Sequence, residues 1–357
     1  MKKLKIMISG IGNRALPKRP EGSNWLGWVE LIRRSEQFEL VAAHDISEDA
    51  RKRIVERGYL AETQTYGDLD QMLEEVQCDA ILVSNPAEYH ADTVAKAVRK
   101  GLHILIEKPF VNNLKEGKQL VEAIEQKGIV AAVVQNWRSK SVGLALHDSI
   151  QSGLIGRIGH IMFRYVRNRE NPNYPPYIFE EPYPLLYAMG IHHLDLFRYI
   201  LRDEYESVSG HSFKPPWSLY KSDTGVSLFL KTGNGTPVMY SGTVSSMNNA
   251  LFQESLVIEG EKGTLFNESP WLEPPLWFFP RGSQEKVDLT KGVEDASIAG
   301  QYNISDEYIL GDFYRAVVSG KKSLCSAEDG LRSIAALEAS RRACETGITV
   351  FLKDMER

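Results

Sequence analysis

Cysteine is scarce in this sequence: its 357 residues include three, Cys78, Cys325 and Cys344, which lie far apart. An odd number of distant cysteines provides neither a CxxC metal pair nor a disulfide framework, which indicates a reducing compartment. No apolar run approaches the roughly 18 residues of a membrane span. The apolar stretch at residues 4–8 is too short for the core of a signal peptide. We therefore expect a cytoplasmic protein without a membrane segment.

Charge of one sign is also lacking. The 42 Lys and Arg residues against 47 Asp and Glu give a formal net charge of −5, with no long basic run, so nucleic acid is not an expected partner. The sequence contains neither a P-loop nor a Gly-x-Ser-x-Gly motif, which leaves NTP-driven and serine-hydrolase functions without support. Hydrophobic residues at 43% and charged residues at 25% are typical of a globular chain, and the length predicts two or three domains.

The first third of the chain alternates short apolar runs with helical patterns. This alternation predicts a doubly wound parallel sheet with helices on both faces, over a first domain at residues 1–136. The strands are nearly continuously apolar, as expected for a sheet covered on both sides. The expected strands are residues 5–9, 38–44, 80–84, 103–106 and 129–134, and the expected helices are residues 25–35, 48–57, 69–76, 92–100 and 114–127.

From residue 137 the pattern changes, and residues 137–357 are expected to form a second, α+β domain. Its strand-like segments and the hairpin signal at Thr232-Gly233-Asn234-Gly235 predict an open, mostly antiparallel sheet with helices on one face. The two closing helices are candidates for packing back on the first domain. The expected strands are residues 158–166, 207–213, 226–231, 238–246 and 254–259; the helices are residues 142–151, 306–319 and 327–346; residues 171–184 are expected to be a loop and residues 270–303 irregular.

A glycine-rich turn follows the first expected strand. In Gly10-Ile11-Gly12-Asn13-Arg14-Ala15, a G-x-G-x-x-A motif, the first glycine permits a tight turn and the second admits a pyrophosphate to the backbone. Asp45 ends the second strand, where an acid hydrogen-bonds the adenine ribose and repels a 2′-phosphate. We therefore expect NAD rather than NADP, although Arg51 and Lys52 leave NADP open.

The spacing of this motif is unusual. Gly10 and Asp45 are 35 positions apart, against the usual roughly 20, and we assign the excess to an inserted loop at residues 16–24. The alternative is a plain turn followed by a surface acid. We favour cofactor binding because the turn, the strand order and the acid agree.

A charged pair and a proline, Glu107-Lys108-Pro109, end the strand expected at residues 103–106. Active sites of open α/β sheets lie at the carboxyl ends of strands. A lysine in that position donates to a substrate oxygen and stabilises a developing alkoxide. In isolation a solvated surface pair would be the better interpretation of these residues.

Together these motifs and several others resemble the Gfo/Idh/MocA family, the glucose–fructose oxidoreductase and inositol dehydrogenase group, over nearly the whole chain. The resemblance implies an N-terminal Rossmann domain, a C-terminal open antiparallel sheet, and transfer of a hydride between NAD(P) and a sugar or polyol hydroxyl. The motifs that carry it are Gly10-Ile11-Gly12, Asp45, Ser84-Asn85-Pro86 with His90, Glu107-Lys108-Pro109, Ser152-Gly153-Leu154-Ile155-Gly156, Gly190-Ile191-His192-His193-Leu194-Asp195 and Glu328-Asp329-Gly330-Leu331.

The resemblance also implies roles for single residues. Lys108 would touch both cofactor and substrate, Asn85 and Pro86 would line the nicotinamide side, and Glu107 would lie near the ribose. The expected cofactor contacts are Gly10, Gly12, Asn13, Arg14, Asp45, Ser84, Asn85, Pro86, His90, Glu107 and Lys108.

A helix expected over residues 188–201 carries the candidate proton relay, His192. Asp195 shares its face, and His193 points about 90–100° away. Family dehydrogenases usually carry Asp one turn before this histidine, where this chain has Ala188. Asp195 could then orient His192, because i, i+3 neighbours touch. Two other residues, Tyr187 and Glu180, are alternatives for that role.

Other readings of this helix stay open. His192 could be a structural histidine bonded to a backbone group. A metal site at His192 and Asp195 lacks a clear third ligand, so no metal is expected.

The expected substrate contacts are Arg138, Trp137, His193 and Tyr183, around a substrate held between the Rossmann sheet and the second sheet. Arg164, Arg167 and Arg169 also alternate along or past a strand, where a solvated face is the simpler interpretation. Two other functions remain open: an enzyme that retains NAD for lyase, epimerase or glycosidase chemistry, and a silent dinucleotide-binding sensor. The alternating strands at residues 226–246 predict a homodimer or homotetramer through the second sheet.

Overall fold

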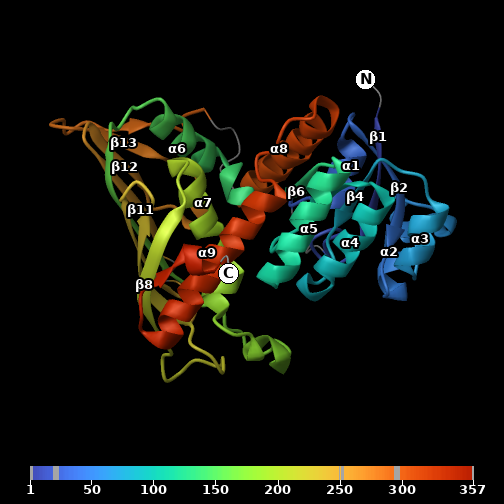
Figure 1. Ribbon diagram of the computed structural model, residues 1–357, viewed down its shortest axis with the longest axis horizontal. Coiled ribbons are helices and arrows are strands. Elements are labelled where there is room, and N and C mark those ends of the chain that lie inside the picture. Colours follow the sequence, from blue (N-terminus) through green and yellow to red (C-terminus); the bar gives the residue numbers. More distant parts are fainter. Residues whose placement is uncertain (1–2, 19–23, 249, 251–252, 293–297, 356–357) are drawn as a thin grey trace. The chain divides into compact units, whose positions relative to one another are not determined.

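The computed structural model describes residues 3–18, 24–248, 250, 253–292 and 298–355 (Figure 1). The chain forms two compact units. The first comprises Met1–Ser139 and Tyr302–Ile334, and the second comprises Lys140–Gln301 and Ala335–Arg357. The first unit thus includes a late segment of the chain.

The first unit contains a parallel sheet of six strands in the described residues, in the order β3-β2-β1-β4-β5-β6. This is the order of a Rossmann fold, and it confirms the predicted doubly wound sheet. The order places the carboxyl ends of β1, β4 and β5 at one edge. The strands are β1 (Leu4–Ser9), β2 (Phe38–His44), β3 (Thr65–Tyr66), β4 (Ala80–Val83), β5 (His103–Ile106) and β6 (Ala131–Val133).

Helices connect these strands and begin and end at recognisable residues. The Asn113 side chain caps α5 by accepting from Lys115 N and Glu116 N, and Gly128 ends that helix in a left-handed conformation. Of the predicted inserted loop, residues 19–23 lie outside the described residues, and α1 begins at Trp28 rather than at residue 25. The helices are α1 (Trp28–Arg34), α2 (Glu48–Glu56), α3 (Leu69–Glu75), α4 (His90–Lys100) and α5 (Leu114–Lys127).

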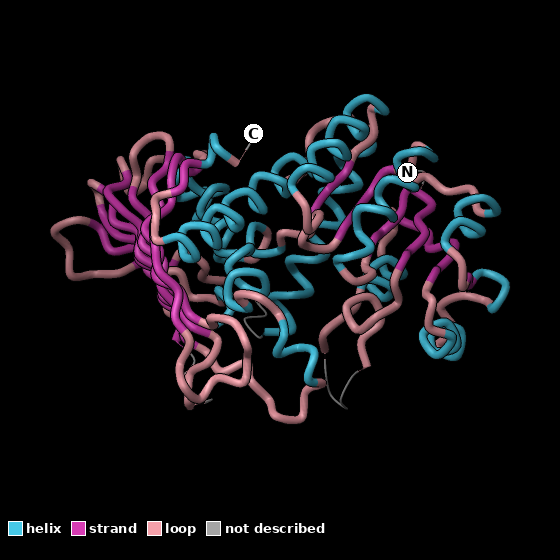
Figure 2. Tube along the Cα trace, turned by 60° about the horizontal axis from the view of Figure 1, so that its bottom comes forward, coloured by secondary structure: helices cyan, strands magenta, loops and turns pink. Residues whose placement is uncertain are grey.

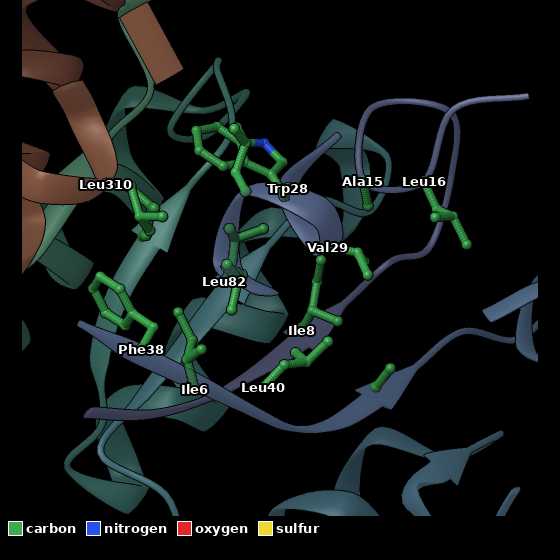
Figure 3. Packing of buried hydrophobic residues seen from close by; sticks show 14 of the residues in the cluster. Ile6, Ile8, Ala15, Leu16, Trp28, Val29, Phe38, Leu40, Leu82 and Leu310 are labelled. Carbon is green, nitrogen blue, oxygen red and sulfur yellow. The ribbon is translucent and has the colours of Figure 1, made fainter. Parts of the chain in front are cut away.

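The core of the first unit lies between its sheet and α1, with a contribution from α8 (Ile298–Ser319). Figure 3 shows Ile6 and Ile8 of β1 packed among side chains of β2, β4 and α1. Phe38 stacks on Phe313 of α8 at 6.2 Å between ring centroids. Burying each such side chain stabilises the fold by about 1.5–3 kcal/mol.

The second unit contains a sheet of nine strands in the described residues, in the order β14-β13-β12-β11-β7-β10-β9-β8-β15. Its neighbouring strands pair antiparallel except β7 and β10, which are parallel. The prediction of a mostly antiparallel sheet is confirmed. The strands are β7 (Ile158–Val166), β8 (Tyr205–Phe213), β9 (Gly225–Thr232), β10 (Pro237–Thr243), β11 (Gln253–Gly260), β12 (Gly263–Asn267), β13 (Trp277–Pro280), β14 (Val287–Asp288) and β15 (Val350–Phe351).

Helices α6 (Ser141–Gln151) and α7 (Ile191–Leu201) lie on one side of this sheet (Figures 1 and 2). The burial of β7 alternates accordingly. Phe163 and Tyr165 are buried beneath the helices, whereas Met162 and Arg164 are exposed on the other face. The last helix, α9 (Ala327–Thr346), is divided between the units after Ile334.

Two predicted segments differ in the structure. Residues 270–303 were expected to be irregular, but β13 pairs with β12 and α8 begins at Ile298; residues 293–297 lie outside the described residues. The predicted helix at residues 188–201 is a π-helical turn (Leu186–Gly190) followed by α7. Within the described part of the chain, no helix is long and apolar enough to cross a membrane.

Candidate functional site

The glycine turn lies at the carboxyl end of β1. Gly10 has φ 92°, and its N–H donates to His44 O at 2.8 Å. A Cβ at this position would lie 2.4 Å from Asn85 N, so only glycine allows the turn to approach the end of β4. A Cβ at Gly12 would meet no described atom within 4 Å. The backbone at Gly12 is therefore open to a ligand.

Asp45 is held beside this turn. Its Oδ2 accepts from Ile11 N at 2.6 Å, and its Oδ1 accepts from Ser47 N at 2.9 Å. Arg51 Nη1 donates to the Asp45 carbonyl oxygen at 2.5 Å. A carboxylate offers about four acceptor positions, so these bonds leave acceptor capacity for a ribose hydroxyl.

Arg14 and Glu107, both predicted cofactor contacts, bind each other. Arg14 Nε donates to Glu107 Oε1 at 2.7 Å, and its Nη1 lies 2.8 Å from Asp306 Oδ2. Burial alone would lower the pKa of Arg14, but the carboxylates of Asp306 and Glu107 raise it above its usual value. Trp28 Nε1 also donates to Glu107 Oε1, at 2.8 Å. Neither Trp28 nor Asp306 was predicted for the site, and the sequence carries no signal for them.

His90 connects the ends of β4 and β5. Its ring is 1% exposed, with Nδ1 2.7 Å from Pro109 O and Nε2 3.0 Å from Asn85 O. Burial lowers the pKa of His90, and the two carbonyl oxygens oppose that change. His90, which was predicted to contact the cofactor, is thus placed to orient the backbone carbonyls of Asn85 and Pro109.

Three buried polar atoms beyond β4 and β6 fit a bound dinucleotide. Ser84 Oγ, Asn85 Oδ1 and Asn136 Oδ1 have no hydrogen-bond partner among the described residues. A buried polar atom without a partner costs about 1–3 kcal/mol. The hydroxyl and amide groups of a nicotinamide nucleotide would satisfy such atoms, and the glycine turn and Asp45 suit its adenosine half. The residues present therefore fit NAD.

The remaining predicted residues of the first unit divide into accessible and buried positions. Lys108 is half-buried at the end of β5, and Asn13 is exposed, with its Oδ1 accepting from Lys18 N. Trp137 and Arg138 are 1% and 3% exposed. Arg138 Nη1 donates to Leu324 O at 2.7 Å, within the same unit. Trp137 and Arg138, predicted as substrate contacts, are therefore both buried in the structure.

In the second unit the π-helical turn alters the expected helix face. Ala188 lies within this π-helical turn, Leu186–Gly190, and His192 follows it on α7. His192 is half-buried on α7, and Asp195 is buried with its Oδ1 3.5 Å from Arg198 Nη1. Arg198 also binds Glu204, with Nε 2.6 Å from Oε2. The negative charge of Asp195 is therefore shared with Arg198.

The two alternative orienting residues have other partners. The Tyr187 hydroxyl donates to Glu338, and burial together with that carboxylate raises the pKa of Tyr187. Glu180 lies 2.5 Å from Lys221 Nζ. Of the three candidates for orienting His192, which are Asp195, Tyr187 and Glu180, Asp195 is the one that lies on α7 together with His192.

His193 lies in the core instead of a substrate-facing wall. Its Nδ1 is 2.9 Å from the Tyr240 hydroxyl, and its ring centroid is 4.6 Å from that of Phe163. The side chain is fully buried, which lowers the pKa of the imidazole well below its usual value. Tyr183 is half-buried, has φ 45°, and donates from its backbone N–H to Ser222 Oγ. Of these two predicted substrate contacts, Tyr183 is the accessible one.

A cavity of about 750 Å³ lies within the second unit, and Ala188 is part of its wall. Arg167 and Arg169 line it, although the sequence favoured a solvated face for both. Trp271 also lines it and was not predicted, because nothing in the local sequence around residue 271 marks a site. No cluster of three or more metal-ligating side chains occurs in the described parts of the chain.

These features define a class of protein: a dinucleotide-dependent enzyme with a Rossmann unit and a separate antiparallel unit. Residues 22–135 match the model of the oxidoreductase family with an NAD-binding Rossmann fold, and residues 144–266 match the GFO/IDH/MocA C-terminal domain. The chain belongs to this Gfo/Idh/MocA family, as its motifs predicted. It is an oxidoreductase whose cofactor is NAD.

Named relatives cover most of the chain. Myo-inositol 2-dehydrogenase of Thermotoga maritima is 22% identical over 88% of this chain and 92% of its own length. D-apiose dehydrogenase of Paraburkholderia graminis is 25% identical over 82% and 77%. The fold is shared with an oxidoreductase from Agrobacterium radiobacter, solved in complex with NAD+, L-tartaric acid and magnesium, with a TM-score of 0.86, 20% identity and coverage of 99% and 100%.

Proposed function

We propose that this protein is an NAD-dependent dehydrogenase or reductase acting on a CH–OH group of a sugar, a polyol or a derivative of one. The observation that carries the proposal is the edge of the Rossmann sheet where three features meet. Gly10 touches Asn85, and His90 joins Asn85 to Pro109, the residue after Lys108. The named relatives, an inositol and an apiose dehydrogenase, support this substrate class.

Four side chains would serve the reaction. Bound NAD would supply the acceptor or donor of the hydride that leaves or enters at the substrate carbon. The Lys108 ammonium donates to the reacting oxygen and stabilises its negative charge. His192 removes or returns the hydroxyl proton, and Asp195 holds the imidazole in position through its charge. Tyr183 is the proposed substrate contact from the second unit.

The test measures binding and turnover separately. NADH affinity is measured by fluorescence, and oxidation of a sugar and polyol panel with NAD+ is followed at 340 nm. Lys108→Ala should lower kcat by about 10²–10³-fold while NADH affinity stays within about threefold. Lys127→Ala removes an exposed lysine from α5 and is the matched control. Near-native turnover in Lys108→Ala would contradict the proposal.

Ala188 favours a second candidate function. Without the usual acid near His192, the protein could retain NAD for transient oxidation in a lyase, epimerase or glycosidase reaction, or bind NAD as a silent sensor. Retained NAD would survive purification, and substrate would be consumed without accumulation of NADH. A sensor would bind ligand without converting it.

We also propose a homodimer or homotetramer that forms through the exposed face of the second sheet, and a cytoplasmic location. Met162 and Phe229 are 41% and 50% exposed on that face, and apolar side chains of this size usually find a partner. The three cysteines are free in the structure, which agrees with a reducing compartment. Sedimentation at micromolar concentration should show an oligomer that Phe229→Glu dissociates. A monomeric native protein would contradict the assembly.

A further inference from the structure

The cavity beside Ala188 receives two arginines from one short segment. Arg167 and Arg169 follow β7 at alternate positions, which places their side chains on the same side of an extended backbone. Hydrogen bonds hold that segment: Arg167 N donates to Thr243 O at 3.0 Å, and Arg169 N donates to Val244 O at 2.8 Å. The backbone at both arginines is therefore held in place beside the cavity that the two residues line.

Arg169 has unused donor capacity at this position. Its Nη1 is buried and has no hydrogen-bond partner among the described residues. Tyr220 lines the same cavity; burial raises the pKa of its hydroxyl, and the positive charge of Arg169 opposes that rise. A buried guanidinium nitrogen without an acceptor is costly. An anionic ligand in the cavity would supply the missing acceptor.

Trp271 forms an apolar wall next to the arginines. The Arg167 guanidinium carbon lies 4.2 Å from the centre of the indole ring. Trp271 has φ 63°, and its backbone is held by the buried carboxylate of Glu254, which accepts from Trp271 N at 2.8 Å and Leu272 N at 2.9 Å. An indole face beside two cations suits a sugar ring that carries an anionic substituent.

The acidic residues that line the cavity, Glu170 and Glu181, bear on how well its arginines can bind an anionic ligand. Glu170 accepts from Ser218 Oγ at 2.7 Å and Leu219 N at 2.8 Å, so its carboxylate is engaged by a neighbouring loop. Glu181 is exposed. Ala188 adds no charge, where the family resemblance implies an aspartate. The two arginines and the two glutamates give the cavity lining no formal net charge. Such a lining accommodates a ligand with one negative charge better than a ligand with two.

We propose that this cavity binds the carboxylate of the substrate, and that the enzyme acts on acidic sugars or polyols rather than neutral ones. The inference rests on the proposed function, because Ala188 lies on the turn that leads into the helix bearing His192. The planar guanidinium of Arg169 matches a carboxylate with two parallel hydrogen bonds. A phosphate monoester offers similar oxygens but carries close to two charges, and it is the alternative that the experiment tests.

The experiment measures binding by calorimetry to the full-length protein saturated with NAD+. The probes within each set differ only at the terminal carbon. The first set is D-glucose, D-glucuronate and D-glucose 6-phosphate, and the second is D-galactose and D-galacturonate. We expect at least one acid to bind tenfold or more tightly than its neutral counterpart. Arg169→Gln should weaken that acid by about 10- to 100-fold and leave NADH affinity unchanged. Arg157→Gln, which removes an exposed arginine from the same unit, is the matched control.

A second pair of variants separates charge from size. Ala188→Asp should weaken binding of the acid by about tenfold or more through like-charge repulsion, whereas Ala188→Asn should change it less than threefold. Equal binding of acids and neutral sugars, or an unchanged acid affinity in Arg169→Gln, would overturn the inference. Tighter binding of the phosphate than of the acid would overturn the carboxylate assignment. Acid binding without NADH formation would instead count against the proposed function.

Discussion

Replacing Gly10 with alanine tests how the first unit brings its glycine turn to the end of β4. Gly10 has φ 92°, a conformation that L-residues rarely adopt. An alanine there also places its Cβ 2.4 Å from Asn85 N and 2.5 Å from Ser84 C, both backbone atoms. The two effects add: the residue is strained, and either the turn or the end of β4 must move.

The magnitude follows from comparison with a glycine that has only one of these problems. Gly58 has φ 69°, but a Cβ there meets no described atom within 4 Å, so Gly58→Ala should cost about 1–2 kcal/mol of unfolding free energy. Gly10→Ala carries the same strain and a steric overlap of about 1–3 kcal/mol, which gives about 2–5 kcal/mol. Gly12→Ala has neither problem and should leave stability unchanged.

Urea unfolding followed by Rossmann-unit tryptophan fluorescence, together with NADH titration, checks this order. Gly12→Ala should fold normally yet bind NADH at least tenfold more weakly, because its methyl group occupies the space open to the pyrophosphate. Gly10→Ala should lose both stability and NADH binding. The reasoning is refuted if Gly10→Ala is no less stable than Gly58→Ala, or if Gly12→Ala binds NADH like the native protein.

Three further predictions concern charged groups. Asp45→Ala should narrow the preference for NADH over NADPH, measured by titration; equal native affinities would contradict this role for Asp45. Asp195→Asn should lower kcat and shift its pH profile, whereas a purely structural Asp195 would change only the melting temperature. Burial raises the pKa of Glu254 from 4.5 to about 7, so the native state keeps a proton that the unfolded chain has released. Glu254 therefore lowers the unfolding free energy as pH rises between about 4.5 and 7, whereas the buried histidines, whose pKa values are lowered, raise it over the same range. The unfolding free energy of Glu254→Gln should rise more steeply with pH, or fall less, than that of the native protein, and identical pH slopes in the two proteins would contradict this.

The elements that the sequence predicted well are those set by local patterns. The strand at residues 158–166 and the helix at residues 327–346 have the predicted bounds, because alternation and helical periodicity are carried by neighbouring residues. The Rossmann sheet followed from apolar runs that must be covered on both faces. The glycine turn and Asp45 were predicted together because the turn follows the first strand and the acid ends the second, even though their separation of 35 positions is unusual.

The features that the sequence did not predict depend on distant partners or on a single added residue in a turn. Arg138 was expected to face a substrate, but its partner Leu324 is 186 positions away. His193 was expected near the substrate because it adjoins His192. In the structure His193 lies on a different face of α7, which packs on β7 and β10. The π-helical turn at Leu186–Gly190, which contains Ala188, stands where the sequence predicted the start of an α-helix.

The role of Ala188 is explained by the residues that surround it in the structure rather than by the aspartate that the family usually has there. In the sequence, the alanine is a missing partner for His192. In the structure it shares a cavity wall with Arg167 and Arg169. An aspartate on that wall would attract one of the guanidinium groups and reduce the positive charge available to a ligand. The alanine thus leaves Arg169 Nη1 for an outside acceptor, and a ligand carboxylate bound there would bring to the cavity the negative charge that position 188 lacks.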